Sequence, residues 1–169
     1  IRRELEFPTE GEINSEMQDL DPEFFVNIYG DGSLTNPTNW WAALGGFGVW
    51  LGSWNKPGED VPGRRETSYY GPALGQTGTS TRQELSAWIM VLIMPTRSNY
   101  ATDSASMLGK ALELIEAAKI HEQLQADGKP GRKKNPFGKP WGLQTDGDLW
   151  EQAWKAVLKR GAANQRLRK

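Results

Sequence analysis

The stretch FFVNIYGDGSLT, residues 24–35, sets how the fold begins. Its apolar, β-forming residues predict a first strand over residues 24–30, and Gly30-Asp31-Gly32-Ser33 predicts the turn that ends it. A lone carboxylate, that of Asp31, would then lie where the strand leaves the sheet. Asp beside Gly is the ordinary way to end a strand, so Asp31 is either a turn residue or a metal ligand that needs acidic partners elsewhere in the chain.

Two more strands are predicted directly after this one. In ALGGFGVWLGSW, residues 43–54, glycines alternate with Phe47, Val49 and Leu51, which is typical of a strand that other backbone approaches closely. Residues 66–74 form a third short β-rich segment. Because short polar turns join the three segments, they predict an antiparallel meander.

The pattern then changes to the period of a helix. Apolar residues recur at helical spacing in STRQELSAWIMVLIM, residues 80–94, with Ser80 or Thr81 as the expected N-cap and Pro95 as the stop. Glu84 lies one turn into this helix. A strand over residues 97–102 follows, and Asp103 stands at its junction with a second helical pattern. Strand, helix and strand in this order imply a parallel crossover, so the sheet should be mixed.

A loop and a last helix complete the chain. Residues 127–142, DGKPGRKKNPFGKPWG, are rich in Gly, Pro and Lys and predict a loop. Asp148 and Glu151 have the spacing of a capping box, and Gly161 is placed as the C-terminal stop of the helix. The final residues, QRLRK, are typical of the start of another strand. We therefore expect an α/β fold with a mixed sheet flanked by helices.

The composition limits the chemistry that the chain can perform. There is no Cys, which excludes disulfides and thiolate sites, and a single His excludes a multi-histidine metal cluster. No apolar run approaches the roughly 20 residues that span a membrane, so we expect a soluble, intracellular protein without membrane contact. Residues 128–169 hold 11 of the 20 Lys and Arg but only three of the 21 Asp and Glu. This basic segment is either a footprint for a polyanion or a solvated loop and helix.

Three acidic residues occupy comparable places in the predicted fold. Asp31 follows the first strand, Asp103 follows the fourth, and Glu84 lies on the helix that would pack across them. Gathered carboxylates repel one another, and divalent cations relieve that repulsion. Hard oxygen ligands suit Mg²⁺ or Mn²⁺. Each residue taken alone is better explained as a turn or capping residue than as a metal ligand.

Five segments, in this order, resemble the successive signatures of ribonuclease H. The resemblance covers roughly residues 24–169, and it implies a central five-stranded mixed sheet flanked by helices. It also implies hydrolysis of the RNA strand of an RNA–DNA hybrid with two Mg²⁺ ions, for which Mn²⁺ can substitute. The segments are FFVNIYGDGS (24–33), LGGFGVWLG (44–52), TSTRQELSAWIMVL (79–92), YATDSASMLGKAL (100–112) and KPWGLQTDGDLWEQAWKAVL (139–158).

The resemblance assigns a role to each acidic residue. Asp31 matches the carboxylate that bridges both metals, and Glu84 and Asp103 match those that hold the ion on the leaving-group side. Glu84 also stands where the family senses a ribose 2′-hydroxyl, the group that separates RNA from DNA.

The resemblance also implies contacts with the hybrid. Ser104 is open to two interpretations, a hybrid contact or the first turn of a helix. The basic loop would grip the DNA strand through its phosphates. The residues at positions of hybrid contact are Thr79, Ser80, Thr81, Ser104, Lys129, Arg132, Lys133, Lys134, Lys139 and Trp141.

The same resemblance predicts how the chain is organised. Residues 1–23 are interpreted as an acidic linker or arm, and residues 24–169 as a monomeric ribonuclease H-like domain without its C-terminal end. The family has a fourth acidic residue and a mobile His beyond the fifth strand, and His121, expected on the surface, does not replace them. Without the fourth carboxylate, the chain is expected to be weakly active or inactive as a nuclease. The domain would belong to a retroelement polyprotein, linked to a polymerase domain, or to a free-standing enzyme. The alternative is a module that binds hybrids, or serves as a scaffold, without cleaving them.

Overall fold

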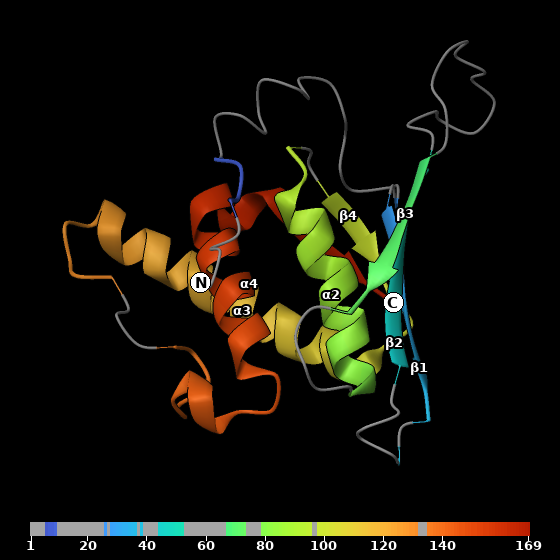
Figure 1. The fold of residues 1–169 in the computed structure, drawn as a ribbon. Coiled ribbons are helices and arrows are strands. Elements are labelled where there is room, and N and C mark those ends of the chain that lie inside the picture. Colours follow the sequence, from blue (N-terminus) through green and yellow to red (C-terminus); the bar gives the residue numbers. More distant parts are fainter. Residues whose placement is uncertain are drawn as a thin grey trace, which may run out of the picture.

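A five-stranded mixed sheet forms one layer of the fold (Figure 1). The computed structural model describes residues 6–9, 26, 28–36, 38, 44–52, 67–73, 79–95, 98–131 and 135–169. The strand order is β3-β2-β1-β4-β5; β1 pairs antiparallel with β2 and parallel with β4. This arrangement confirms the predicted α/β fold with a ribonuclease H-like mixed sheet. The strands are β1 (Ile28–Thr35), β2 (Leu44–Leu51), β3 (Thr67–Pro72), β4 (Ser98–Ala101) and β5 (Gln165–Arg168).

Strand β1 is longer than the sequence predicts. It continues through Asp31 to Thr35, because β2 pairs with it along its whole length. Strand β4, in contrast, pairs with β1 only at Ile28 and Tyr29. The prediction that the strand ends at Gly30 was therefore wrong. Asp31 lies inside β1, yet just beyond the point at which β4 stops beside it.

The glycines on either side of Asp31 serve close packing and not a turn. Neither has a positive φ among the described residues. A Cβ atom on Gly30 would overlap the hydroxyl of Tyr100, and one on Gly32 would lie 2.5 Å from the backbone nitrogen of Glu84. The two glycines therefore allow β4 and the helix that carries Glu84 to approach β1.

The helices gather on one side of the sheet (Figure 1). Helix α2 packs across β1 and β2, and α4 packs on α2. None of the helices that the structure describes combines the length and the apolar character needed to cross a bilayer. The helices are α2 (Ser80–Ile93), α3 (Ala105–Ala126) and α4 (Gly147–Arg160), with short 3₁₀ turns at Trp141–Leu143 and Ala162–Asn164.

The hydrophobic core lies between the sheet and these helices. Trp88 of α2 and Trp150 of α4 are buried with their ring centroids 6.3 Å apart, as the apolar faces of both helices predict. Phe7 is also part of the core, so this short described piece of the predicted N-terminal arm packs on the domain. His121 was expected on the surface, but it is half-buried and contacts the ring of Trp154 edge-on.

The helix caps differ from those predicted. Thr79, and not Ser80 or Thr81, caps α2: its hydroxyl accepts a hydrogen bond from the Arg82 amide at 2.9 Å. The capping box predicted for α4 was wrong, because the helix begins at Gly147 and the carboxylate of Asp148 instead binds the buried guanidinium of Arg82. Leaving the buried guanidinium of Arg82 without an anion would cost more free energy than a capping hydrogen bond from Asp148 would contribute.

Candidate metal centre

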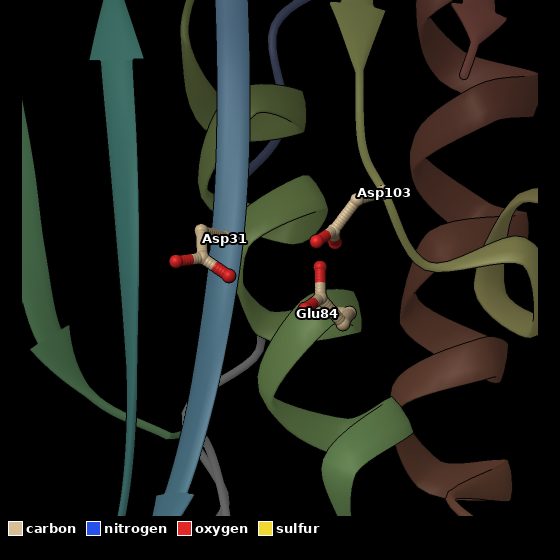
Figure 2. A group of neighbouring side chains, drawn as sticks. All are labelled: Asp31, Glu84 and Asp103. Carbon is tan, nitrogen blue, oxygen red and sulfur yellow. The ribbon is translucent and has the colours of Figure 1, made fainter.

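Three carboxylates from three elements meet beside the point at which β4 ends next to β1 (Figure 2). Asp31 comes from β1, Glu84 from the first turns of α2, and Asp103 from the segment that follows β4. One ligand oxygen from each lies within 4.8 Å of the other two. The structure thus brings together the three acidic residues that the sequence singled out.

Glu84 is held in place by two hydrogen bonds. The Gly32 amide donates to Oε1 at 3.0 Å, and the hydroxyl of Thr102 donates to Oε2 at 3.1 Å. Gly32 lies past the end of β4, so its amide is available to a side chain. The Ser104 amide donates in turn to the Thr102 hydroxyl at 3.1 Å. Strand β1 and the end of β4 therefore both orient the Glu84 carboxylate.

Three ionised carboxylates without a neutralising cation are electrostatically unfavourable at this site. Burial raises the pKa of Glu84, and the charges of Asp103 and Asp31 raise it further, against the opposing effect of its two hydrogen bonds. Within the described part of the chain, no Lys or Arg forms an ion pair with any of the three. A divalent cation would supply the missing positive charge, and carboxylate oxygens are the ligands that hard cations prefer. The triad could therefore hold a metal ion.

Gly32 offers a test of how closely α2 must approach β1. We expect Gly32→Ala to lower the free energy of unfolding by about 1–3 kcal/mol, because the new methyl group meets the Glu84 backbone. Gly48→Ala is the matched control. Gly48 is paired with Asp31 in β2, and a methyl group added there would meet open space, so the change should be neutral or slightly stabilising. Chemical denaturation of both variants checks this, and equal losses would contradict the packing account.

Two of the hydroxyl-bearing residues predicted to contact a hybrid, Thr81 and Ser104, lie close to Ser106 at the start of α3. Thr81 of α2 and Ser106 of α3 have their hydroxyls 3.5 Å apart, and Ser104 is also 3.5 Å from Ser106. Ser104 is the N-cap of α3, and Ser80 is exposed. Thr79 is engaged differently, since its hydroxyl donates to Asp146 at 2.6 Å. The structure therefore presents a hydroxyl cluster beside Asp103, of which the sequence analysis missed Ser106.

Two of the basic residues predicted to contact the DNA strand, Lys129 and Lys139, lie in different parts of the molecule. Lys129 follows the C-terminal end of α3, which at 22 residues extends about 33 Å from the end that Ser104 caps. Lys139 is closer to that capped end. Its carbonyl accepts from Gln144 at 2.7 Å, and Gln144 accepts from Lys110 in the second turn of α3 at 3.1 Å. Arg132, Lys133 and Lys134 lie outside the described residues.

Aromatic contacts hold residues 135–142, the described part of the loop that leads into α4. Lys110 Nζ lies 4.6 Å from the Phe137 ring centroid and 4.7 Å from that of Trp150. The half-buried Trp141 packs edge-on against Phe137, with centroids 5.8 Å apart. Lys139 is therefore presented by a fixed segment of the loop, while Trp141 helps to fix it.

The face of the sheet away from α2 carries aromatic side chains beside Asp31. Ile28 and Val49 are buried, whereas the alternating Tyr29 and Trp50 are exposed, with ring centroids 5.3 Å apart. They line a shallow hollow of about 280 Å³ together with Asp31 and Tyr70. The sequence analysis did not single out these aromatics, although their alternation with buried residues was the available signal.

Comparisons with known proteins give no match for this chain, either among models of protein families or among curated proteins.

Proposed function

We propose that the chain is a ribonuclease H-type nuclease that hydrolyses the RNA strand of RNA–DNA hybrids with Mg²⁺. One observation carries the proposal: β1, α2 and the end of β4 contribute Asp31, Glu84 and Asp103 to a single cluster of carboxylates within 4.8 Å. These are the elements to which the sequence resemblance assigns the acidic residues. The mixed strand order supports the proposal, because it makes β1 and β4 neighbours.

Each acidic residue has a distinct part in the proposed reaction. Asp31 and Asp103 are exposed and would bind cations from the open side, whereas Glu84 is buried and fixed by Gly32 and Thr102. Two bound Mg²⁺ ions would ready a water molecule for in-line attack and stabilise the departing 3′ oxygen. Mn²⁺ would serve as a substitute. Glu84 would also contact the 2′-hydroxyl of the scissile ribonucleotide, which gives the preference for RNA.

A substrate comparison tests this function. An end-labelled RNA–DNA hybrid, a DNA duplex and an RNA duplex of the same sequence are incubated with the chain and Mg²⁺ or Mn²⁺. We expect cleavage of the RNA strand of the hybrid alone, with complete loss of cleavage in EDTA. Equal cutting of the DNA duplex would contradict the proposal. Binding of the hybrid without cleavage in either metal would favour the module that binds hybrids.

Lys139 is expected to contribute a phosphate contact. Lys139→Gln should weaken hybrid binding and reduce the slope of log affinity against log salt by about 1, because one fewer counterion is released. Lys155→Gln is the control, since Lys155 is exposed on α4 and pairs with Glu151. Fluorescence anisotropy over a salt series measures both slopes. The same slope in the two variants would exclude Lys139 from the interface.

A further inference from the structure

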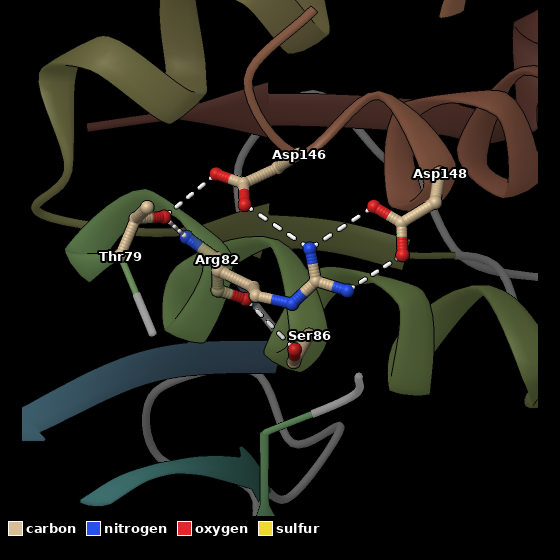
Figure 3. A network of polar contacts seen from close by, with 5 residues as sticks. All are labelled: Thr79, Arg82, Ser86, Asp146 and Asp148. Atoms are coloured by element: carbon tan, nitrogen blue, oxygen red, sulfur yellow. Dashed lines mark hydrogen bonds and ion pairs between the residues drawn. The ribbon is translucent and has the colours of Figure 1, made fainter. Parts of the chain in front are cut away.

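A buried ionic network joins the start of α2 to the start of α4 (Figure 3). Arg82 is 3% exposed; its Nη1 lies 3.1 Å from Asp146 and 3.0 Å from Asp148, and its Nη2 lies 2.6 Å from Asp148. Thr79 donates to Asp146 at 2.6 Å, and Ser86 donates to the Arg82 carbonyl at 2.7 Å. Side chains thereby attach the first turns of α2 to the start of α4, and Ser86 binds the Arg82 carbonyl within α2.

Stability alone is a weak reason for such a network. Ionic groups pay a large desolvation penalty when they are buried, and well-packed apolar residues of similar volume often stabilise a fold as well. Asp146 moreover adopts a left-handed backbone conformation, with φ of 55°, that non-glycine residues rarely take. In this conformation the Asp146 carboxylate accepts hydrogen bonds from Arg82 and Thr79. Fixing the position of one element against another is the best-supported use of buried polar groups of this kind.

Arg82 and Glu84 lie on the same turn of α2, so holding Arg82 in place also fixes the direction of the Glu84 side chain. Residues two apart in an α-helix are about 200° apart around its axis, so their side chains leave from opposite sides. Arg82 points to α4, whereas Glu84 points to β1 and the end of β4, where Gly32 and Thr102 bind it. A rotation or shift of this turn would move the Glu84 carboxylate away from those of Asp31 and Asp103.

A second buried arginine holds the other end of α2. Arg160 of α4 is fully buried, and its Nη1 donates to the carbonyls of Leu92 and Met94 at 3.0 and 2.5 Å. Leu92 is eight residues beyond Glu84, or about 12 Å along the helix. Arg160 therefore joins the same two helices but lies far from the carboxylates.

We propose that Arg82, held by Asp146 and Asp148, is a positioning residue for the metal centre: it sets the place of Glu84 and thereby the affinity of the triad for divalent cations. The inference rests on the proposed metal-dependent function, and it makes the start of α4 a supporting part of the site. Residues that support metal ligands typically contribute 10–100-fold to affinity or activity.

The test compares Arg82→Met with Arg160→Met, since both lose a buried guanidinium between α2 and α4. We expect both to lower the melting temperature. Only Arg82→Met should weaken Mn²⁺ binding, by about tenfold or more in calorimetric titration, and lower kcat on the hybrid to a similar extent. It should also speed hydrogen exchange at the Gly32 amide relative to the rest of β1, a readout that needs no metal. Arg82→Lys should recover part of each loss.

The outcomes separate the inference from the proposed function. Equal effects of Arg82→Met and Arg160→Met on Mn²⁺ affinity and Gly32 exchange would overturn the positioning role, as would a wild-type protein that binds no Mn²⁺. Arg82-dependent Mn²⁺ binding in a protein that does not cleave the hybrid would reject the nuclease and keep the positioning role. If Arg82→Met does not fold, the partly exposed Asp148 allows the same comparison through Asp148→Asn, with unchanged Mn²⁺ affinity counting against the inference.

Discussion

Asp31→Asn is expected to lower the rate of RNA cleavage in the hybrid more than about 100-fold, beyond the usual range for residues that only support a metal ligand. Asn keeps the size of the side chain but removes the charge that Asp31 contributes to the cluster with Glu84 and Asp103. The measurement is the single-turnover rate on a labelled hybrid at saturating Mg²⁺.

The control for this prediction is Asp127→Asn. Asp127 is an exposed carboxylate at the C-terminal end of α3, so its loss should leave the rate unchanged. Both variants should melt close to the wild-type temperature, since neither change alters packing. Cleavage by Asp31→Asn at the wild-type rate would remove the carboxylate cluster from the mechanism.

Glu84→Gln is expected to stabilise the metal-free protein while it abolishes cleavage. Because the folded-state pKa of Glu84 lies above its ordinary value of 4.5, the folded protein favours the protonated carboxyl. The stability that this group contributes is complete below about pH 4.5 and is lost as the pH rises through the raised pKa. Gln does not titrate and can keep the bond from Gly32. The variant should therefore melt at a higher temperature than wild type near pH 7, and at the wild-type temperature near pH 4.

Added Mg²⁺ should reverse that order at neutral pH. A cation that binds only the folded state raises the melting temperature of the wild type by mass action, and the Gln variant binds it more weakly. Glu113→Gln, at an exposed position on α3, serves as the control and should show neither effect. Melting curves followed by circular dichroism, with and without Mg²⁺, measure the difference. A Gln variant less stable than metal-free wild type at neutral pH would contradict the electrostatic account of the site.

The sequence predicts the elements of this fold well because local patterns determine them. The alternating segment 43–54 contains β2, the β-rich segment 66–74 contains β3, helical periods became α2, α3 and α4, and Gly161 ends α4 with a φ of 81°. The order of these elements also predicts a parallel crossover and a mixed sheet, and the structure shows that β1 and β4 are parallel neighbours. Asp31, Glu84 and Asp103 could be grouped from the sequence on the condition that these two strands are neighbours.

The features that the sequence did not predict depend on contacts between distant segments. Gly30 and Gly32 resemble a turn, but their role is set by Tyr100 and Glu84, which approach from β4 and α2. Asp148 has the spacing of a cap until Arg82, 66 residues earlier, is placed beside it. Such pairings leave no periodic signal in a single sequence.

The most direct test of the metal centre is the position of bound Mn²⁺ in crystals of the chain, located by its anomalous scattering. Carboxylate ligands of such cations lie within about 2.5 Å of the ion. We predict anomalous density within that distance of oxygens from Asp31, Glu84 and Asp103, and its loss in crystals of Asp31→Asn. Mn²⁺ bound elsewhere, with these three carboxylates making no contact to it, would contradict the account.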